Sequence, residues 1–136
     1  MTGEEGFVTR TQTLNNKGQV IVERYFDADG NPAGKTGPEG KEAYCTVEYT
    51  YDKMGNINRE KYYDKQDELV LCRKGYAMIY REYDAYNRVI YEKFYGTDGG
   101  TIQMEDGAVS YRYEYDDDGK QIRIRKYDWL DHEINE

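Results

Sequence analysis

The chain has 136 residues and a net charge of −8, and it contains 16 tyrosines but only 22 Leu, Ile, Val and Phe residues. This length corresponds to one domain, no apolar run approaches the roughly 20 residues of a membrane span, and the acidic balance argues against nucleic acid as a partner. So few aliphatic residues with this charge would normally favour disorder. Tyrosine reverses that interpretation because its ring is large, apolar and has few rotors, so we expect a thin aromatic core.

A repeat of 32 residues organises the chain. Three tyrosines are spaced at this interval, and each is followed twelve residues later by a second tyrosine. The three pairs are Tyr51 and Tyr63, Tyr83 and Tyr95, and Tyr115 and Tyr127. A weaker upstream copy has Leu14 and Phe26 at the same two positions. Similarity at a fixed period is typical of repeat proteins, so we divide the single domain 1–136 into four copies at about 6–38, 43–74, 75–106 and 107–136.

Taken in chain order, each copy predicts a β-hairpin. In the first copy the expected strands are 7–14 and 19–26, with a turn at 15–18. The later hairpins are expected to pair 45–51 with 57–63, 77–83 with 89–95, and 109–115 with 121–127. The alternation of period two that marks a half-buried strand is clearest in 45–51. The Asp/Asn-x-x-Gly pattern between the strands suits a type I turn closed by a left-handed residue.

The segments between hairpins are less regular. Residues 32–40 hold both prolines, which predicts a loop. Residues 69–72 and 102–104 are expected to be short apolar strands, although 65–72 also fits a short helix. We therefore predict an all-β fold of tandem hairpins that form a twisted, mostly antiparallel sheet or a short open roll.

The sequence contains no set of residues that supports catalysis or a metal site. The Asp-rich stretches 27–31 and 116–119 resemble pieces of a calcium loop, but neither supplies the full set of ligands, so turn chemistry explains them. His132 has no second His or Cys near it in the sequence. No phosphate-binding glycine loop, nucleophile elbow or Cys-x-x-Cys pattern occurs. The sequence thus predicts no enzyme, no cofactor and no metal site, and Cys45 is expected to be a small core residue.

Stacking the copies aligns like residues in columns. One aromatic column is Tyr25, Tyr62 and Phe94, and its neighbour is Phe26, Tyr63, Tyr95 and Tyr127. A basic column, Arg24, Lys61, Lys93 and Arg125, lies beside an acidic one, Glu23, Glu60 and Glu92, which ends in Ile124. Adjacent columns point to opposite faces of a strand because side chains alternate. As candidate binding residues we select Tyr25, Tyr62, Phe94, Tyr63, Tyr95 and Tyr127, which could form a stacking surface for sugar rings; packing in the core and between copies is the alternative.

At 51–56 and again at 115–120 the sequence resembles bacterial tandem repeats of the YD type, the Rhs-like family. Residues 62–64 and 25–30 look like the Tyr-rich hairpins of cell-wall-binding and MORN-like repeats. The resemblance implies β-hairpin repeats used for binding, surface display or encapsulation. This chain departs from it in its period, which is longer than the roughly twenty residues of those repeats, and in having too few copies for a large shell.

The sequence therefore predicts a non-enzymatic binding or scaffold repeat module, bacterial and part of a larger repeat protein or surface assembly. The alternative is a carbohydrate- or cell-wall-binding module that uses exposed Tyr columns, so the expected partner is a protein or a glycan. No signal-peptide pattern is visible at Met1, and the compartment stays open between cell surface, secreted and cytoplasmic. At the C-terminal end we expect Trp129 and Leu130 either to fold back as a cap or to bury against a second copy in a homodimer.

Overall fold

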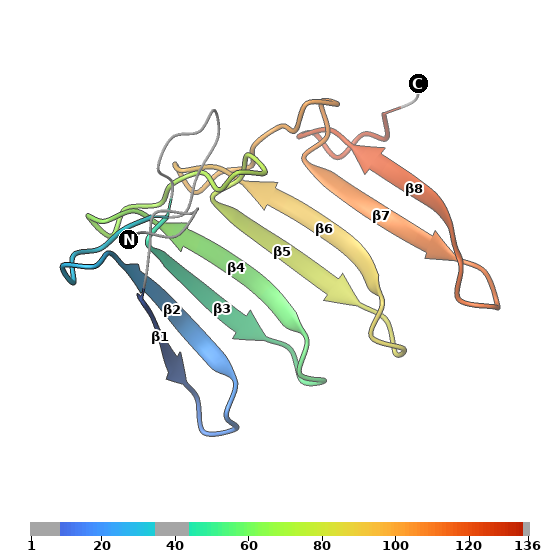
Figure 1. Ribbon diagram of the computed structural model, residues 1–136. Helices are drawn as coiled ribbons and strands as arrows, with labels where there is room; N and C mark the ends of the chain where they lie inside the picture. Colours follow the sequence, from blue (N-terminus) through green and yellow to red (C-terminus); the bar gives the residue numbers. More distant parts are fainter. Residues whose placement is uncertain (1–8, 35–43, 135–136) are drawn as a thin grey trace.

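The computed structural model describes residues 9–34 and 44–134 and shows one open, twisted sheet of eight antiparallel strands, in the order β1 to β8 (Figure 1). The strands are β1 (Thr9–Leu14), β2 (Val20–Phe26), β3 (Thr46–Tyr51), β4 (Ile57–Tyr63), β5 (Met78–Tyr83), β6 (Val89–Tyr95), β7 (Ser110–Tyr115) and β8 (Gln121–Tyr127). The all-β prediction of tandem hairpins is confirmed, and they form one open antiparallel sheet. The expected strand residues at 7–8 and most of the loop at 32–40 lie outside the described residues. No helix in the described ranges could cross a membrane.

Strands pair more extensively within a hairpin than between hairpins. The β3–β4 ladder contains six residue pairs, from Thr46↔Tyr63 to Tyr51↔Ile57, whereas the β4–β5 ladder contains only three, from Arg59↔Tyr80 to Lys61↔Met78. The other hairpins and junctions repeat these two patterns. Neighbouring hairpins consequently diverge towards their turns (Figure 1). Contacts other than the ladder must hold the hairpins together at that end of the sheet.

The hairpin turns have the conformation that the Asp-x-x-Gly pattern predicts. In the β3–β4 turn the carboxylate of Asp52 accepts the backbone N–H groups of Met54 and Asn56, both at 2.9 Å. The N–H of Gly55 donates to the Asp52 carbonyl at 3.1 Å. Gly55 has a φ of 88°, a left-handed value that glycine adopts without a steric penalty from a Cβ. Asn87, with a φ of 65°, takes the glycine's place in the third hairpin, as its tolerance of the left-handed region allows.

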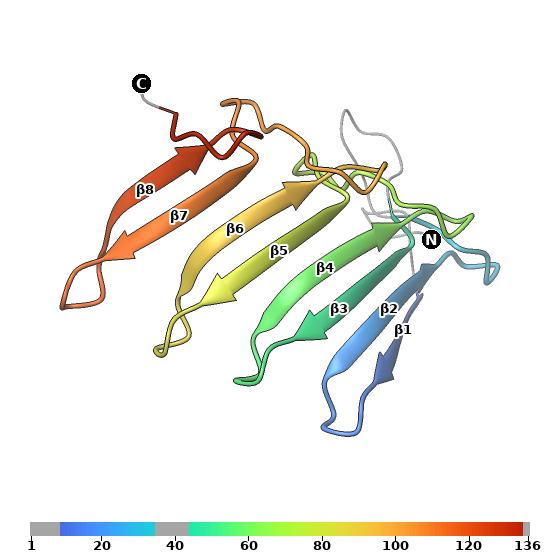
Figure 2. The same cartoon turned by 180° about the vertical axis from the view of Figure 1, so that it is seen from behind.

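After β4 and β6 the chain folds back over one end of the sheet (Figure 2). The expected short strands at 69–72 and 102–104 are wrong, because the structure there has single bridges, Tyr63↔Leu69 and Tyr95↔Thr101. The helix considered for 65–72 is also wrong. The N–H of Val70 donates to the Tyr62 carbonyl at 3.0 Å, and the chain then turns again, so no run of backbone hydrogen bonds is long enough for either element.

The hydrophobic core lies on one face of the sheet, at the end covered by these folded-back segments; we call this the core face. Its buried cluster consists of Tyr25, Val47, Tyr62, Cys72, Tyr76, Ile79 and Phe94. Cys72 and Tyr76 come from the folded-back segment after β4, and the other members of the cluster come from the five strands β2 to β6. Cys45 is buried, as expected for a small core residue. The core is thin and largely aromatic, in agreement with the composition.

Candidate interaction surfaces

A row of polar side chains crosses the middle of the core face. Its acceptors are Glu23, Glu60 and Glu92, one on each of β2, β4 and β6. Glu23 accepts the hydroxyl of Tyr49 at 2.9 Å and the side-chain amide of Gln12 at 3.2 Å. Burial raises the pKa of Tyr49, and its hydrogen bond to Glu23 raises it further. The phenol therefore stays protonated and joins the first hairpin to the second.

Arg81 occupies the centre of this row. Its guanidinium donates to Glu92 at 2.9 Å through Nε and to Glu60 through a close contact from Nη1. All three side chains are no more than 18% exposed. Burial alone would lower the pKa of Arg81, but the hydrogen bonds with the two carboxylates raise it. Tyr113 donates its hydroxyl to Glu92, so the row continues from the third hairpin to the fourth.

Three tyrosines join the hairpins where the ladder between them has ended. The hydroxyls of Tyr51, Tyr83 and Tyr115 donate to the backbone carbonyls of Val20, Ile57 and Val89, at 2.6, 2.7 and 2.5 Å. Each acceptor is the first residue of the last strand in the preceding hairpin. These are the tyrosines of the 32-residue spacing. Their hydroxyls replace the missing backbone hydrogen bonds between diverging hairpins.

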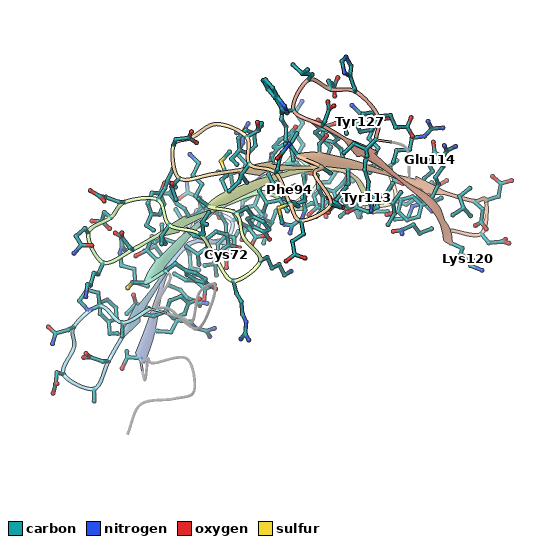
Figure 3. The ribbon with its side chains drawn as sticks, turned by 90° about the horizontal axis from the view of Figure 1, so that it is seen from above. Cys72, Phe94, Tyr113, Glu114, Lys120 and Tyr127 are labelled. Atoms are coloured by element: carbon teal, nitrogen blue, oxygen red, sulfur yellow. The ribbon has the colours of Figure 1, made fainter. Side chains whose placement is uncertain are left out.

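The opposite face of the sheet, which we call the outer face, carries a row of tyrosine and arginine. Figure 3 shows Tyr127 and Glu114 on this side of the sheet and Phe94 and Tyr113 on the other. The guanidinium of Arg59 lies 5.1 Å from the ring centre of Tyr80, and that of Arg112 lies 4.6 Å from Tyr91 and 5.9 Å from Tyr127. The rings of Tyr80 and Tyr91 are 6.2 Å apart, edge to face. These contacts between guanidinium groups and tyrosine rings join the second, third and fourth hairpins.

The structure separates the six candidate binding residues. Tyr25, Tyr62 and Phe94 are 4%, 7% and 4% exposed, so this column packs in the core, the alternative to a stacking surface. The folded-back segments cover it, as Figure 3 shows for Cys72 on the side of Phe94. Tyr63, Tyr95 and Tyr127 lie half-buried on the outer face. A binding role for any of the six remains a prediction. Sequence reasoning missed Tyr80, Tyr91 and Arg112. Tyr80 and Tyr91 meet across the third hairpin, and Arg112 meets Tyr91 through the register between hairpins, which is not visible in a single repeat.

The expected cap at the C-terminal end is also wrong. Trp129 and Leu130 are 66% and 56% exposed. They occupy the middle of a turn in which the Asp128 carboxylate accepts the N–H of Leu130 at 3.0 Å and of His132 at 2.9 Å. Central residues of such a turn point away from the sheet. The alternative in that prediction, burial of Trp129 and Leu130 against a second copy in a homodimer, stays a prediction.

A shallow depression of about 730 Å³ lies beside the folded-back segments and is lined in part by Arg73, Gln103 and Asp106. The Asp106 carboxylate accepts the hydroxyl of Tyr111 at 2.7 Å and pairs with Lys126 at 3.2 Å. Burial would raise the pKa of Asp106, but hydrogen bonds from the Ala108 N–H, Tyr111 and Lys126 lower it. Among residues 9–34 and 44–134, no three His, Cys, Asp or Glu side chains are placed to hold a metal ion.

No protein-family model matches this chain, and no curated protein matches it either. Its surfaces are therefore interpreted from their own geometry.

Proposed function

We propose that the chain is a non-enzymatic protein-binding or scaffold module, bacterial in origin and part of a larger repeat protein or surface assembly. The observation that carries the proposal is the outer-face row of Arg59, Tyr80, Tyr91, Arg112 and Tyr127. Tyrosine and arginine are the residue types enriched at the centres of protein interfaces. Their mutual stacking orders them before a partner arrives, which lowers the entropy lost on binding.

Carbohydrate binding is the second candidate, because half-buried tyrosines line the outer face. A sugar ring stacks on an aromatic face, and several of these faces are already occupied. Arg112 covers Tyr91 and Tyr127, and the ammonium of Lys93 lies 5.9 Å from the ring centre of Tyr95. A sugar would have to displace these cations, which favours a protein partner. Tyr63 instead donates its hydroxyl to Glu48 at 3.1 Å, and it is the best remaining sugar platform.

The two candidates can be distinguished with surface variants. The immobilised chain should capture a protein from cell extract, and Arg112→Ala should lose that capture while Lys53→Ala, in an exposed turn, retains it. Free sugars should not compete. If instead a glycan array binds the wild type and Tyr63→Ala abolishes the signal, the module binds carbohydrate. Capture that survives Arg112→Ala would remove the outer face from the proposal.

A further inference from the structure

The last strand of the sheet differs from its counterparts in the other hairpins. β8 lies at the C-terminal edge of the sheet (Figures 1 and 2). Its residues Ile122 and Ile124 are 60% and 45% exposed, and they share the core face with Tyr113, which pairs with Ile124. No strand among the described residues pairs with the outer side of β8. The core face thus ends in an exposed apolar pair beside an open edge.

A substitution in the glutamate row marks this edge as different. Ile124 stands 32 residues after Glu92 and occupies its place in the fourth hairpin. Each glutamate of the row accepts a side-chain donor from the strand that follows it, namely Tyr49, Arg81 or Tyr113. Ile124 cannot accept such a hydrogen bond. A strand that pairs with β8 must instead bring an apolar side chain to this position.

The backbone of β8 can continue the ladder. At the three junctions the N–H groups of Tyr25, Tyr62 and Phe94 donate at 2.9 Å to carbonyls just before the following strand, those of Cys45, Ala77 and Val109. Lys126 holds their place in β8. In an antiparallel ladder these groups face the same side at every second residue, so Ile124, two residues before Lys126, directs its N–H and C=O to the open edge. The Gln121 carbonyl also takes the place of the carbonyls at Val20, Ile57 and Val89, which accept tyrosine hydroxyls.

We propose that β8 binds an extended segment of another protein by strand addition, in the register that β3 takes on β2. This inference rests on the proposed protein-binding function. In that register Val47 pairs with Glu23 and Glu48 pairs with Val22, so the equivalent segment places an apolar residue on Ile124 and an acidic residue on Arg123. A tyrosine three residues after the acidic one reaches the Gln121 carbonyl, as Tyr51 reaches Val20. The partner is therefore a strand of the pattern apolar-acidic-x-x-Tyr.

Two other occupants fit less well. The first strand of a second copy would place Arg10 against Ile124, because Arg10 precedes Leu14 as Val47 precedes Tyr51. Self-pairing of two β8 strands would bring Arg123 and Arg125 of the two copies together, and like charges on opposed strands are destabilising. An acidic segment complements Arg123, whose side chain is 54% exposed although it lies 3.8 Å from the Glu133 carboxylate.

The test uses a fluorescein-labelled peptide with the sequence of residues 46–52, which has the required pattern, and follows its fluorescence polarisation on titration with the full chain. We expect saturable binding. Methylating the Val47 nitrogen of the peptide leaves its charge intact but removes a ladder hydrogen bond, and should weaken binding about tenfold. Ile124→Pro removes the Ile124 N–H that faces the peptide, and it does so in an edge strand, where proline is tolerated. It should weaken binding about as much. Circular dichroism and the melting temperature confirm that this variant folds.

Several results would overturn the proposal. The first is the absence of saturable binding. The second is equal binding of the methylated peptide, which would show that charge attraction alone holds the peptide. The third is equal binding of a peptide of residues 9–15, which lacks the pattern. Self-association that Ile124→Pro removes would assign the edge to a second copy. Protein capture by the outer face, lost in Arg112→Ala, is a separate readout, so the proposed function can survive failure of the edge.

Discussion

The centre of the sheet and its C-terminal edge use the same chemistry in different surroundings. In the centre, Arg81 links Glu60 and Glu92 on the core face, and the three side chains are only 17–18% exposed. Near the edge, Arg125 links Glu114 and Glu133, whose side chains are about a third or more exposed. Ion pairs in water contribute little, whereas a charge that loses its partner away from water is costly. Position in the sheet, not residue type, decides which bridge holds the hairpins together.

Among the changes that test this difference, alkaline pH is expected to lower stability most, because it acts on the buried tyrosines of the core face. Burial raises the pKa of Tyr49, Tyr62, Tyr76 and Tyr113, and nearby acidic groups raise it further. Unfolded tyrosine loses its proton at about pH 10, so above that pH the unfolded chain holds fewer protons than the folded one, and stability falls as pH rises.

We expect the urea midpoint to be level up to about pH 9 and to fall above about pH 10. The fall should be less steep when Tyr49 and Tyr113 are both replaced by Phe, because two of the shifted groups are then gone. A midpoint that stays level through about pH 11 would show that these tyrosines are not protected from ionisation.

Cavity formation should separate the two regions next. Ile79 on β5 is 2% exposed, whereas Ile122 on β8 is exposed. Ile79→Ala should lower the free energy of unfolding by about 2–5 kcal/mol, and Ile122→Ala by less than about 0.5 kcal/mol. Chemical denaturation measures both. Similar losses would mean that Ile122 is covered in solution, for example by self-association.

The two bridging arginines give a matched comparison. Methionine in place of Arg81 keeps much of its length but leaves Glu60 and Glu92 without their shared cation, so we expect a loss of about 3 kcal/mol. Arg125→Met should cost no more than about 1 kcal/mol, because water solvates Glu114 and Glu133. Equal losses in a urea titration would refute the distinction between the regions.

A smaller effect is expected from the tyrosines that join hairpins. Tyr83→Phe removes only the hydroxyl that donates to the Ile57 carbonyl and should cost about 1 kcal/mol. Tyr86→Phe is the control, since Tyr86 is 78% exposed and only three residues away. If the two variants unfold at the same urea concentration, the hydroxyl does not contribute to the junction.

The sequence could predict the features that arise within one hairpin but not those that depend on contacts between hairpins. Hairpins and turns were predictable because their signals are local: alternation within seven residues, and an Asp that accepts the N–H groups of its own turn. The buried face was not, because Tyr25 and Phe26, or Tyr62 and Tyr63, are adjacent aromatics on opposite faces. Tyr76 and Cys72 settle the choice by folding over one of them. The tyrosine contacts between hairpins likewise depend on offsets that no single repeat contains.

The smallest change in stability is expected at the edge itself, for Trp129→Ala. Since the indole is mostly exposed, the monomer should change by no more than about 0.5 kcal/mol. The homodimer predicted through this end would nevertheless bury the indole, and Trp129 is the only tryptophan of the chain, so its fluorescence reports on this site alone. If the dimer forms, emission should shift to the blue and resist quenching as concentration rises, and Trp129→Ala should abolish the dimer in sedimentation. Red, freely quenched emission at every concentration would show that the chain does not associate through Trp129 and Leu130.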